Sequence, residues 1–180
     1  MKITDIKLIP VNKFLFVKVY TDEGITGIGE SGDWGFLESS GEVIKSFREY
    51  LIGQDPLRIE HHWQYMYRCF HFRGAAVMGA LSAIDIALYD IAGKYYGVPV
   101  YQLLGGKVRD KLRTYASQLQ FGWGQVGVSE HLWAVTPADY AHNVKLALDE
   151  GFDAIKIDFF DRDEEGKPLN FLDTTGLLTP

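Results

Sequence analysis

Residues 77–91, VMGALSAIDIALYDI, contain the clearest structural pattern in the chain. Apolar residues recur in it at steps of three and four, which is the spacing of one face of an α-helix. They are Val77, Leu81, Ile84, Leu88 and Ile91. The alanines between them favour helix and permit close packing, and the run 97–99, Gly-Val-Pro, ends the pattern. The stretch therefore predicts a long helix with one strongly apolar face.

The residues before this helix alternate between two kinds of pattern. Short β-rich runs cover 3–8, 14–20 and 25–30, and turn residues separate them. Three short strands with tight connections predict an antiparallel meander. Helical spacing follows over 38–51 and again from 56 toward 69. The N-terminal part is therefore expected to be an α+β domain.

A strand–helix–strand pattern begins near residue 112. Residues 112–121 are expected to form a strand. Thr136 is suited to cap a helix whose first position is Pro137, and Gly151 is suited to end it. Residues 154–158 are expected to form the next strand. Two strands joined by a crossover helix form a βαβ unit, so these strands should be parallel.

The domain boundary is expected between residues 105 and 111, which gives domains 1–108 and 109–180. The second has no clear helical period after residue 159. A lone pair of parallel strands cannot cover both faces of its sheet. We therefore expect an incomplete barrel here, with Pro180 not the biological end of the fold.

The overall composition is ordinary for a globular protein. The chain has 180 residues, 47% apolar and 23% charged, and a formal net charge of −6. That charge argues against a nucleic-acid partner, because such affinity depends on clustered Lys and Arg. No apolar run approaches the roughly 20 residues of a membrane helix, and the residues after Met1 lead us to expect no signal peptide. Since the single cysteine, Cys69, excludes an internal disulfide, we expect a cytoplasmic protein without membrane or nucleic-acid partners.

Two charged side chains alternate with isoleucines in AIKID, residues 154–158. Lys156 and Asp158 share one face of the expected strand, and Ile155 and Ile157 share the other. In an α/β barrel the outer face packs against helices, and the inner face points into the active site at the carboxyl end. One interpretation is a cation and a carboxylate at the floor of a substrate pocket. The other is a Lys–Asp pair that closes a sheet edge.

The glycines after residue 121 match a nucleotide-binding pattern. Gly122, Gly124 and Gly127 have the G-x-G-x-x-G spacing. Asp158 ends the next strand, as a ribose-binding acid would. That fold needs a helix that begins within the glycines, so that its N-terminus faces the pyrophosphate. Because Thr136 starts the helix well beyond Gly127, we interpret the glycines as a βα loop; a nicotinamide titration tests this rival oxidoreductase.

Three segments in order resemble one family. Residues 79–106, GALSAIDIALYDIAGKYYGVPVYQLLGG, resemble the central helix and turn of the mandelate racemase and muconate lactonizing enzyme family of the enolase superfamily. Residues 16–30, FVKVYTDEGITGIGE, resemble its N-terminal hairpin. Residues 151–156, GFDAIK, resemble the entry to its second barrel strand. The resemblance covers the chain to about Asp161.

The resemblance implies a fold and a chemistry. The fold is an α+β capping domain followed by the first βαβ unit of a TIM-like barrel. The chemistry is removal of the proton α to a carboxylate, with Mg²⁺ stabilising the enediolate. In the family the carboxylate ligands of the metal come from the third, fourth and fifth barrel strands. We therefore name no metal ligand in this chain and expect the ligands beyond residue 180.

The resemblance also assigns roles to site residues. The second barrel strand of the family usually carries Lys-x-Lys. Lys156 matches the first lysine, which assists at the substrate carboxylate, and Asp158 stands where the second lysine acts as a base. Two capping loops, 31–36 and 70–74, resemble the loops that set specificity. The candidate substrate contacts in these loops are Asp33, Trp34, His71 and Arg73.

These expectations define a leading hypothesis and its alternatives. The leading one is a Mg²⁺-dependent hydro-lyase that dehydrates a sugar acid, an aldonate or aldarate, and forms a homo-oligomer when full length. A racemase, epimerase or cycloisomerase of the same family is the first alternative, and the missing second lysine counts against it. An inactive fragment or binding module is the other, if the chain truly ends at Pro180. This chain alone is expected to be inactive.

Overall fold

The computed structural model describes residues 1–32, 36–123, 134–159 and 167. The chain divides into two units, Met1–Val108 and Arg109–Pro180. The first unit combines one sheet with helices, and the second contains a helix and two short strands. Each unit is described by itself.

The sheet of the first unit is an antiparallel meander. Its strands are β1 (Ile3–Val11), β2 (Phe14–Thr21) and β3 (Thr26–Ser31), in the spatial order β1-β2-β3. Val17 in the middle strand pairs with Leu8 on one side and with Gly29 on the other. The meander predicted from the short β-rich runs is therefore confirmed.

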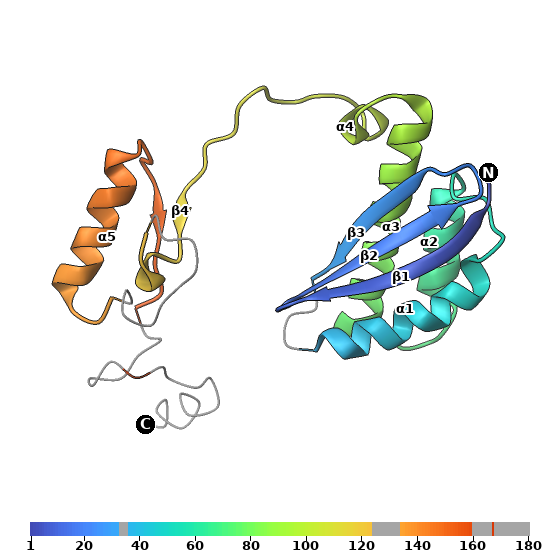
Figure 1. Cartoon of the computed structure of the whole chain (residues 1–180), viewed down its shortest axis with the longest axis horizontal. Coiled ribbons are helices and arrows are strands. Elements are labelled where there is room, and N and C mark those ends of the chain that lie inside the picture. Colours follow the sequence, from blue (N-terminus) through green and yellow to red (C-terminus); the bar gives the residue numbers. More distant parts are fainter. Residues whose placement is uncertain (33–35, 124–133, 160–166, 168–180) are drawn as a thin grey trace. The chain divides into compact units, whose positions relative to one another are not determined.

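The helices of this unit lie on one face of the sheet (Figure 1). They are α1 (Leu37–Leu51), α2 (Ile59–Arg68) and α3 (Ala75–Tyr96). The single turn α4 (Val100–Leu103) follows α3 in the chain and packs against it. Helix α3 ends at Gly97, whose φ of 68° is the left-handed conformation that glycine adopts most readily. The long central helix and its glycine stop are confirmed.

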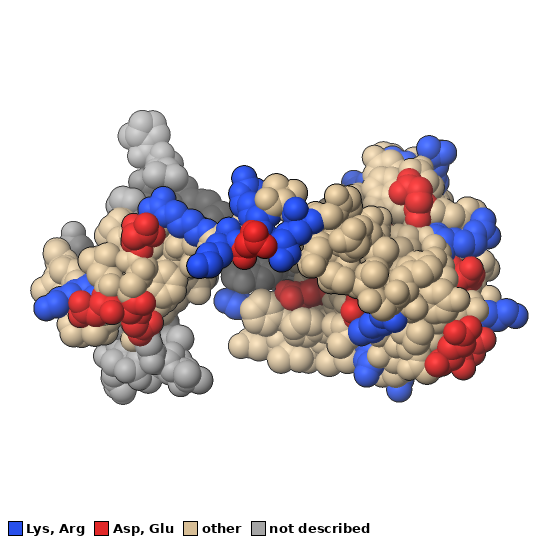
Figure 2. All heavy atoms as spheres, turned by 90° about the horizontal axis from the view of Figure 1, so that it is seen from above, with Lys and Arg blue, Asp and Glu red and all other residues tan. Residues whose placement is uncertain are grey.

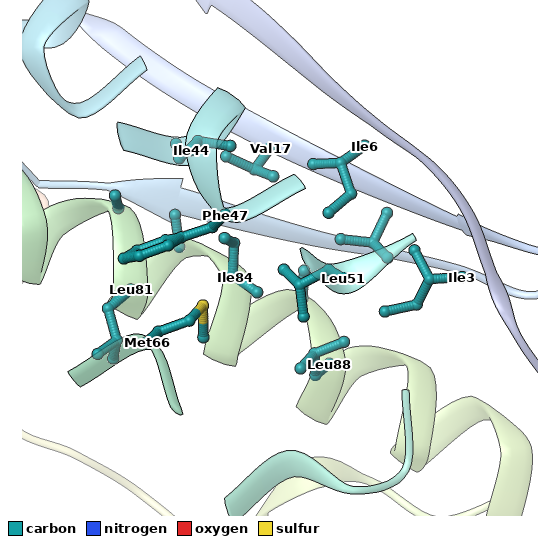
Figure 3. Packing of buried hydrophobic residues seen from close by; sticks show 14 of the residues in the cluster. Ile3, Ile6, Val17, Ile44, Phe47, Leu51, Met66, Leu81, Ile84 and Leu88 are labelled. Carbon is teal, nitrogen blue, oxygen red and sulfur yellow. The ribbon is translucent and has the colours of Figure 1, made fainter. Parts of the chain in front are cut away.

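The hydrophobic core lies between the sheet and helices α1 to α3 (Figure 3). Four of the five residues of the apolar stripe on α3 are at most 1% exposed, and Val77 packs against the cluster while partly buried. Each such Leu or Ile stabilises the fold by roughly 1.5–3 kcal/mol relative to an exposed side chain. The core side chains labelled in the figure are Ile3, Ile6, Val17, Ile44, Phe47, Leu51, Met66, Leu81, Ile84 and Leu88.

Two glycines bring β3 into backbone contact with α3. A Cβ added to Gly29 would lie 1.9 Å from the carbonyl oxygen of Ala83, and one added to Gly27 would lie 2.0 Å from that of Ala87. Real Cβ atoms essentially never come within 3.0 Å of such an atom. The strand and the helix can approach this closely only because neither position of β3 carries a side chain.

Side chains of α3 also bind the outer edge of β3. The backbone N–H of Ile28 donates to Asp90 Oδ2 at 2.9 Å, and Lys94 Nζ donates to the carbonyl of Thr26 at 2.7 Å. Asp90 and Lys94 form an ion pair with each other at 2.7 Å. The two members of one ion pair on α3 thus bind one backbone donor and one backbone acceptor of β3.

The length of α3 corrects one expectation. No apolar run of membrane-spanning length was expected, yet the 22 residues of α3 are long and apolar enough to cross a membrane by length and composition. In the most apolar window of the helix, 44% of the residues are buried inside the protein. The apolar content of α3 is thus partly explained by its place against the sheet, α1 and α2.

In its described residues, the second unit contains a parallel strand pair and an α-helix. Strand β4 (Ala116–Ser117) pairs in parallel with β5 (Ile155–Lys156), and α5 (Pro137–Asp149) connects them. Thr136 caps α5 with a reciprocal capping box to Asp139, and Gly151 follows its end with φ of 96°. The predicted βαβ unit, with its cap and its glycine stop, is therefore present.

The first strand of this unit is shorter than predicted. A strand was expected over 112–121, but only β4 forms, and a 3₁₀ turn, η1 (Leu119–Phe121), follows it. Gln118 adopts φ of 62°, a left-handed conformation outside the β region of regular strands. The strand therefore stops at Ser117, and the expected strand 154–158 is likewise reduced to β5.

Candidate functional site

Lys156 and Asp158 lie at the carboxyl end of β5. Lys156 is the last residue of the strand, Asp158 follows two positions later, and both are exposed. Among the described residues the ammonium of Lys156 makes no hydrogen bond or ion pair, and none joins it to Asp158. Because β4 and β5 are parallel, the end of β4 meets the same edge.

A small apolar cluster holds α5 against the strands. Ala116, Leu119 and Ala147 are buried in it, and Ile157 packs against them. Ile155, which also faces away from Lys156, is 42% exposed. The helix therefore covers the part of this face near Ile157 and leaves Ile155 open.

Asp158 contacts a residue that the sequence analysis did not single out. Gln120 in η1 is 2% exposed, and its Nε2 lies 3.4 Å from Asp158 Oδ2, a long hydrogen bond. The signal available in the sequence was a polar residue between Leu119 and Phe121, both apolar, at the end of the first strand of the βαβ unit. Gln120 was not singled out because a full strand was expected over 112–121. The turn at Gln118 changes which of the following side chains face inward.

The other two described candidates belong to the capping loop between α2 and α3. His71 and Arg73 are both exposed, and the ring of His71 stacks on Phe70 with centroids 5.7 Å apart. Arg73 Nε donates to the carbonyl of Tyr67 at 2.6 Å, and its guanidinium lies 4.2 Å from the centre of the Tyr67 ring. Arg73 therefore binds the last turn of α2 through Tyr67. His71 is exposed to solvent.

A hollow of about 150 Å³ lies beside Arg73. Its walls are mainly apolar and come from α1, α2, the start of α3 and the loop, with Phe47, Met66, Phe70 and Phe72 among them. Such a lining offers few hydrogen bonds to a polar ligand. Asp33 and Trp34, the remaining candidates, lie outside the described residues.

Burial shifts the pKa of two titratable groups of the first unit, His62 and the partly buried Asp85. His62 is fully buried, with Nε2 2.8 Å from the Asp55 carbonyl and Nδ1 2.9 Å from the Tyr50 hydroxyl. Since a carbonyl only accepts, Nε2 carries the proton and Nδ1 accepts from Tyr50. Burial lowers the pKa of His62, and burial followed by the charge of Glu60 raises the pKa of Asp85.

The charges of the described residues do not assemble a metal site. No group of three His, Cys, Asp or Glu side chains comes together in residues 1–32, 36–123 and 134–159. Figure 2 shows basic and acidic side chains distributed together over the face of the first unit that it presents. The residues present therefore supply no ligand set for Mg²⁺.

The fold and the placed residues define a class of protein: an α+β capping domain followed by the first parallel strands of a catalytic barrel. The family model "Mandelate racemase / muconate lactonizing enzyme, N-terminal domain" matches residues 6–105. The chain belongs to this family. The match confirms the resemblance inferred from the hairpin and the central helix.

Named relatives extend the similarity into the second unit. The chain is 43% identical over 159 residues to a D-galactonate dehydratase of Verminephrobacter eiseniae, covering 87% of this chain and 38% of that protein. A putative dehydratase of Salmonella typhimurium with a crystal structure is 42% identical, with a TM-score of 0.84 over 93% of this chain and 45% of that one. An enolase of Pantoea ananatis, solved with D-gluconate and magnesium, is 30% identical, with a TM-score of 0.72 over 87% of this chain and 36% of that one. The chain spans less than half the length of these proteins.

Proposed function

We propose that the protein dehydrates a sugar acid, an aldonate or aldarate, through removal of the proton α to the carboxylate. One observation carries the proposal: Lys156 and Asp158 stand together at the carboxyl end of a parallel strand, in a chain similar to D-galactonate dehydratases. In barrels of this kind the carboxyl ends of the strands carry the active site. The reaction removes a proton from the α carbon and a hydroxide from the β carbon, which leaves as water.

The two side chains suit different parts of such a substrate. The exposed ammonium of Lys156 has no partner among the described residues and is suited to the substrate carboxylate. The Asp158 carboxylate accepts hydrogen bonds, so it is suited to a hydroxyl of the polyol. The lack of an ion pair between them favours the substrate-binding interpretation over a pair that closes the sheet edge.

Magnesium enters this proposal through resemblance alone. In the family it lowers the energy of the negative charge that develops when the α proton leaves. The described residues hold no ligand set for it, so we derive no step through the ion. A cytoplasmic location and a homo-oligomeric state likewise stay predictions.

The experiment tests the product of the complete reading frame against a panel of aldonates and aldarates. We expect one or a few acids to be converted to 2-keto-3-deoxy acids, which a carbonyl reagent detects. We also expect the α proton to exchange with deuterium in D₂O, followed by NMR. Exchange or inversion at the α carbon without loss of water would favour the racemase alternative and overturn the proposal.

Lys156→Met tests the role of the ammonium. We expect turnover to fall by about 10²- to 10⁴-fold, because methionine has no charge with which to bind the substrate carboxylate. Lys145→Met is the matched control, because Lys145 is exposed on α5; its turnover should stay near that of the unmodified protein. Equal turnover of both variants would remove Lys156 from the site.

A further inference from the structure

The turn between β4 and α5 is fixed by the strand next to it. The N–H of Gln118 donates to the carbonyl of Lys156 at 3.1 Å, so the parallel ladder runs up to the turn. Gln118 then adopts φ of 62°, and its own carbonyl accepts from the N–H of Phe121 at 3.1 Å. A non-glycine residue in this conformation is uncommon and persists where surrounding contacts determine it.

Two further contacts hold the backbone on both sides of Gln120. Asn143 of α5, only 6% exposed, donates from Nδ2 to the carbonyl of Leu119 at 2.8 Å. The N–H of Ala134 donates to the carbonyl of Gln120 at 2.8 Å. The position of the Gln120 Cα is therefore fixed by the strand, the helix and the segment that precedes the helix.

The side chain of Gln120 uses this fixed position to reach Asp158. The carboxylate can only accept, so the amide nitrogen of Gln120 faces it, at 3.4 Å. The amide oxygen, Oε1, is buried and has no hydrogen-bond partner among the described residues. A buried acceptor without a partner costs free energy that an apolar side chain of similar shape would avoid. Packing alone therefore does not account for a glutamine at this position.

Building on the proposed function, we propose that Gln120 is a positioning residue for the Asp158 carboxylate. Its amide engages one carboxylate oxygen and restricts the rotation of a side chain that is otherwise exposed. The second oxygen of Asp158 stays available to a substrate hydroxyl. Residues at the ends of two adjacent strands thus act as one unit, with Gln120 acting only through Asp158.

NMR tests the contact without any substrate. The side-chain amide resonances of Gln120 should move in Asp158→Ala, because the acceptor is removed. They should stay in place in Asp153→Ala, which removes an exposed carboxylate paired with Arg113 instead. Unmoved Gln120 resonances in Asp158→Ala would overturn the proposal.

Kinetics test the consequence for the reaction, in the protein as its complete reading frame encodes it. Gln120→Leu should lower kcat on the order of 10²-fold, as misplacement of a reacting group does, and change KM less. In the Asp158→Ala background it should have almost no further effect, because a positioning residue has nothing left to orient. An equal loss in both backgrounds would overturn the proposal.

Gln120→Glu is a second variant, for the case that Gln120→Leu fails to fold. It keeps the size of the side chain but replaces the donor with a second carboxylate, so it should lower kcat as Gln120→Leu does; full turnover would refute the role of the donor. Circular dichroism identifies any variant that fails to fold. If the unmodified protein converts no acid, the proposed function fails, while the Gln120 resonances still decide on the contact.

Discussion

Gly29→Ala probes the contact between β3 and α3. The added Cβ would lie 1.9 Å from the carbonyl oxygen of Ala83 and 2.9 Å from its carbon. The obstacle is helix backbone, so no side-chain rotation relieves it. Since non-bonded atoms sit at about 3.5–4.0 Å, the strand must move away from the helix by more than about 1 Å.

The expected cost follows from two opposing effects. Overpacking of this kind costs typically about 1–3 kcal/mol, and a rigid backbone obstacle belongs at the upper end. Replacing a glycine whose φ is not positive recovers about 0.4–1 kcal/mol through the unfolded chain. We therefore expect a net loss of about 2 kcal/mol, which lowers Tm by about 10 °C in a unit of this size.

The assay is thermal and urea unfolding of the chain, followed by circular dichroism. Ile28→Ala is the matched control: Ile28 neighbours Gly29 on the same strand, but its side chain is 49% exposed on the opposite face. That control should change the free energy of unfolding by less than about 1 kcal/mol. If Gly29→Ala unfolds at the same midpoint as Ile28→Ala, the backbone contact is not as described.

Three further predictions concern stability. Asp85→Asn should stabilise the protein at pH 7, because burial and Glu60 raise the Asp85 pKa and its charged form is the costly one; the gain should shrink as pH falls toward 4, measured by urea midpoints. Thr136→Ala should cost about 1 kcal/mol, because it removes the capping box with Asp139, and the loss should appear as fraying of α5 in hydrogen exchange. His62→Gln should reduce the loss of stability on acidification below pH 6.5: burial lowers the His62 pKa, so the unfolded state takes up the proton first.

Each of these predictions has an outcome that contradicts it. A gain in Asp85→Asn that is the same at pH 4 and pH 7 would mean that the charge of Asp85 is not the cause. Unchanged exchange in α5 after Thr136→Ala would contradict the role of the cap. An unfolding profile of His62→Gln with the pH dependence of the unmodified protein would show that another group takes up the proton.

Much of the fold followed from local patterns. The stripe from Val77 to Ile91 gave the central helix because its period matches the buried face, and Gly97 ends the helix because it alone adopts the left-handed conformation without strain. Thr136 with Pro137 gave the start of α5 for equally local reasons. The strand over 112–121 was predicted too long, because Gln118 leaves the β region through contacts with a strand about 40 positions away, and no local pattern contains that information.

The contacts of the candidate site were harder to predict from the sequence than the fold. Alternation predicted Lys156 and Asp158 on one strand face, but β5 ends at Lys156, so Asp158 lies two positions beyond the strand. The contact with Gln120 depends on the register of β4 against β5 and on the turn between Gln118 and Phe121. The close approach of Gly29 to Ala83 could not be predicted either, because it depends on a contact between segments far apart in the sequence. The need for glycine at positions 27 and 29 becomes clear only from the position of α3.

The ion pair of Asp90 and Lys94 has a consequence for the behaviour of the protein in concentrated solution. An edge strand normally offers unpaired N–H and carbonyl groups on which a strand of another molecule can build. Here the N–H of Ile28 and the carbonyl of Thr26 are already bound by side chains of the same chain. These two groups of β3 are thus unavailable for intermolecular strand addition, a step toward aggregation.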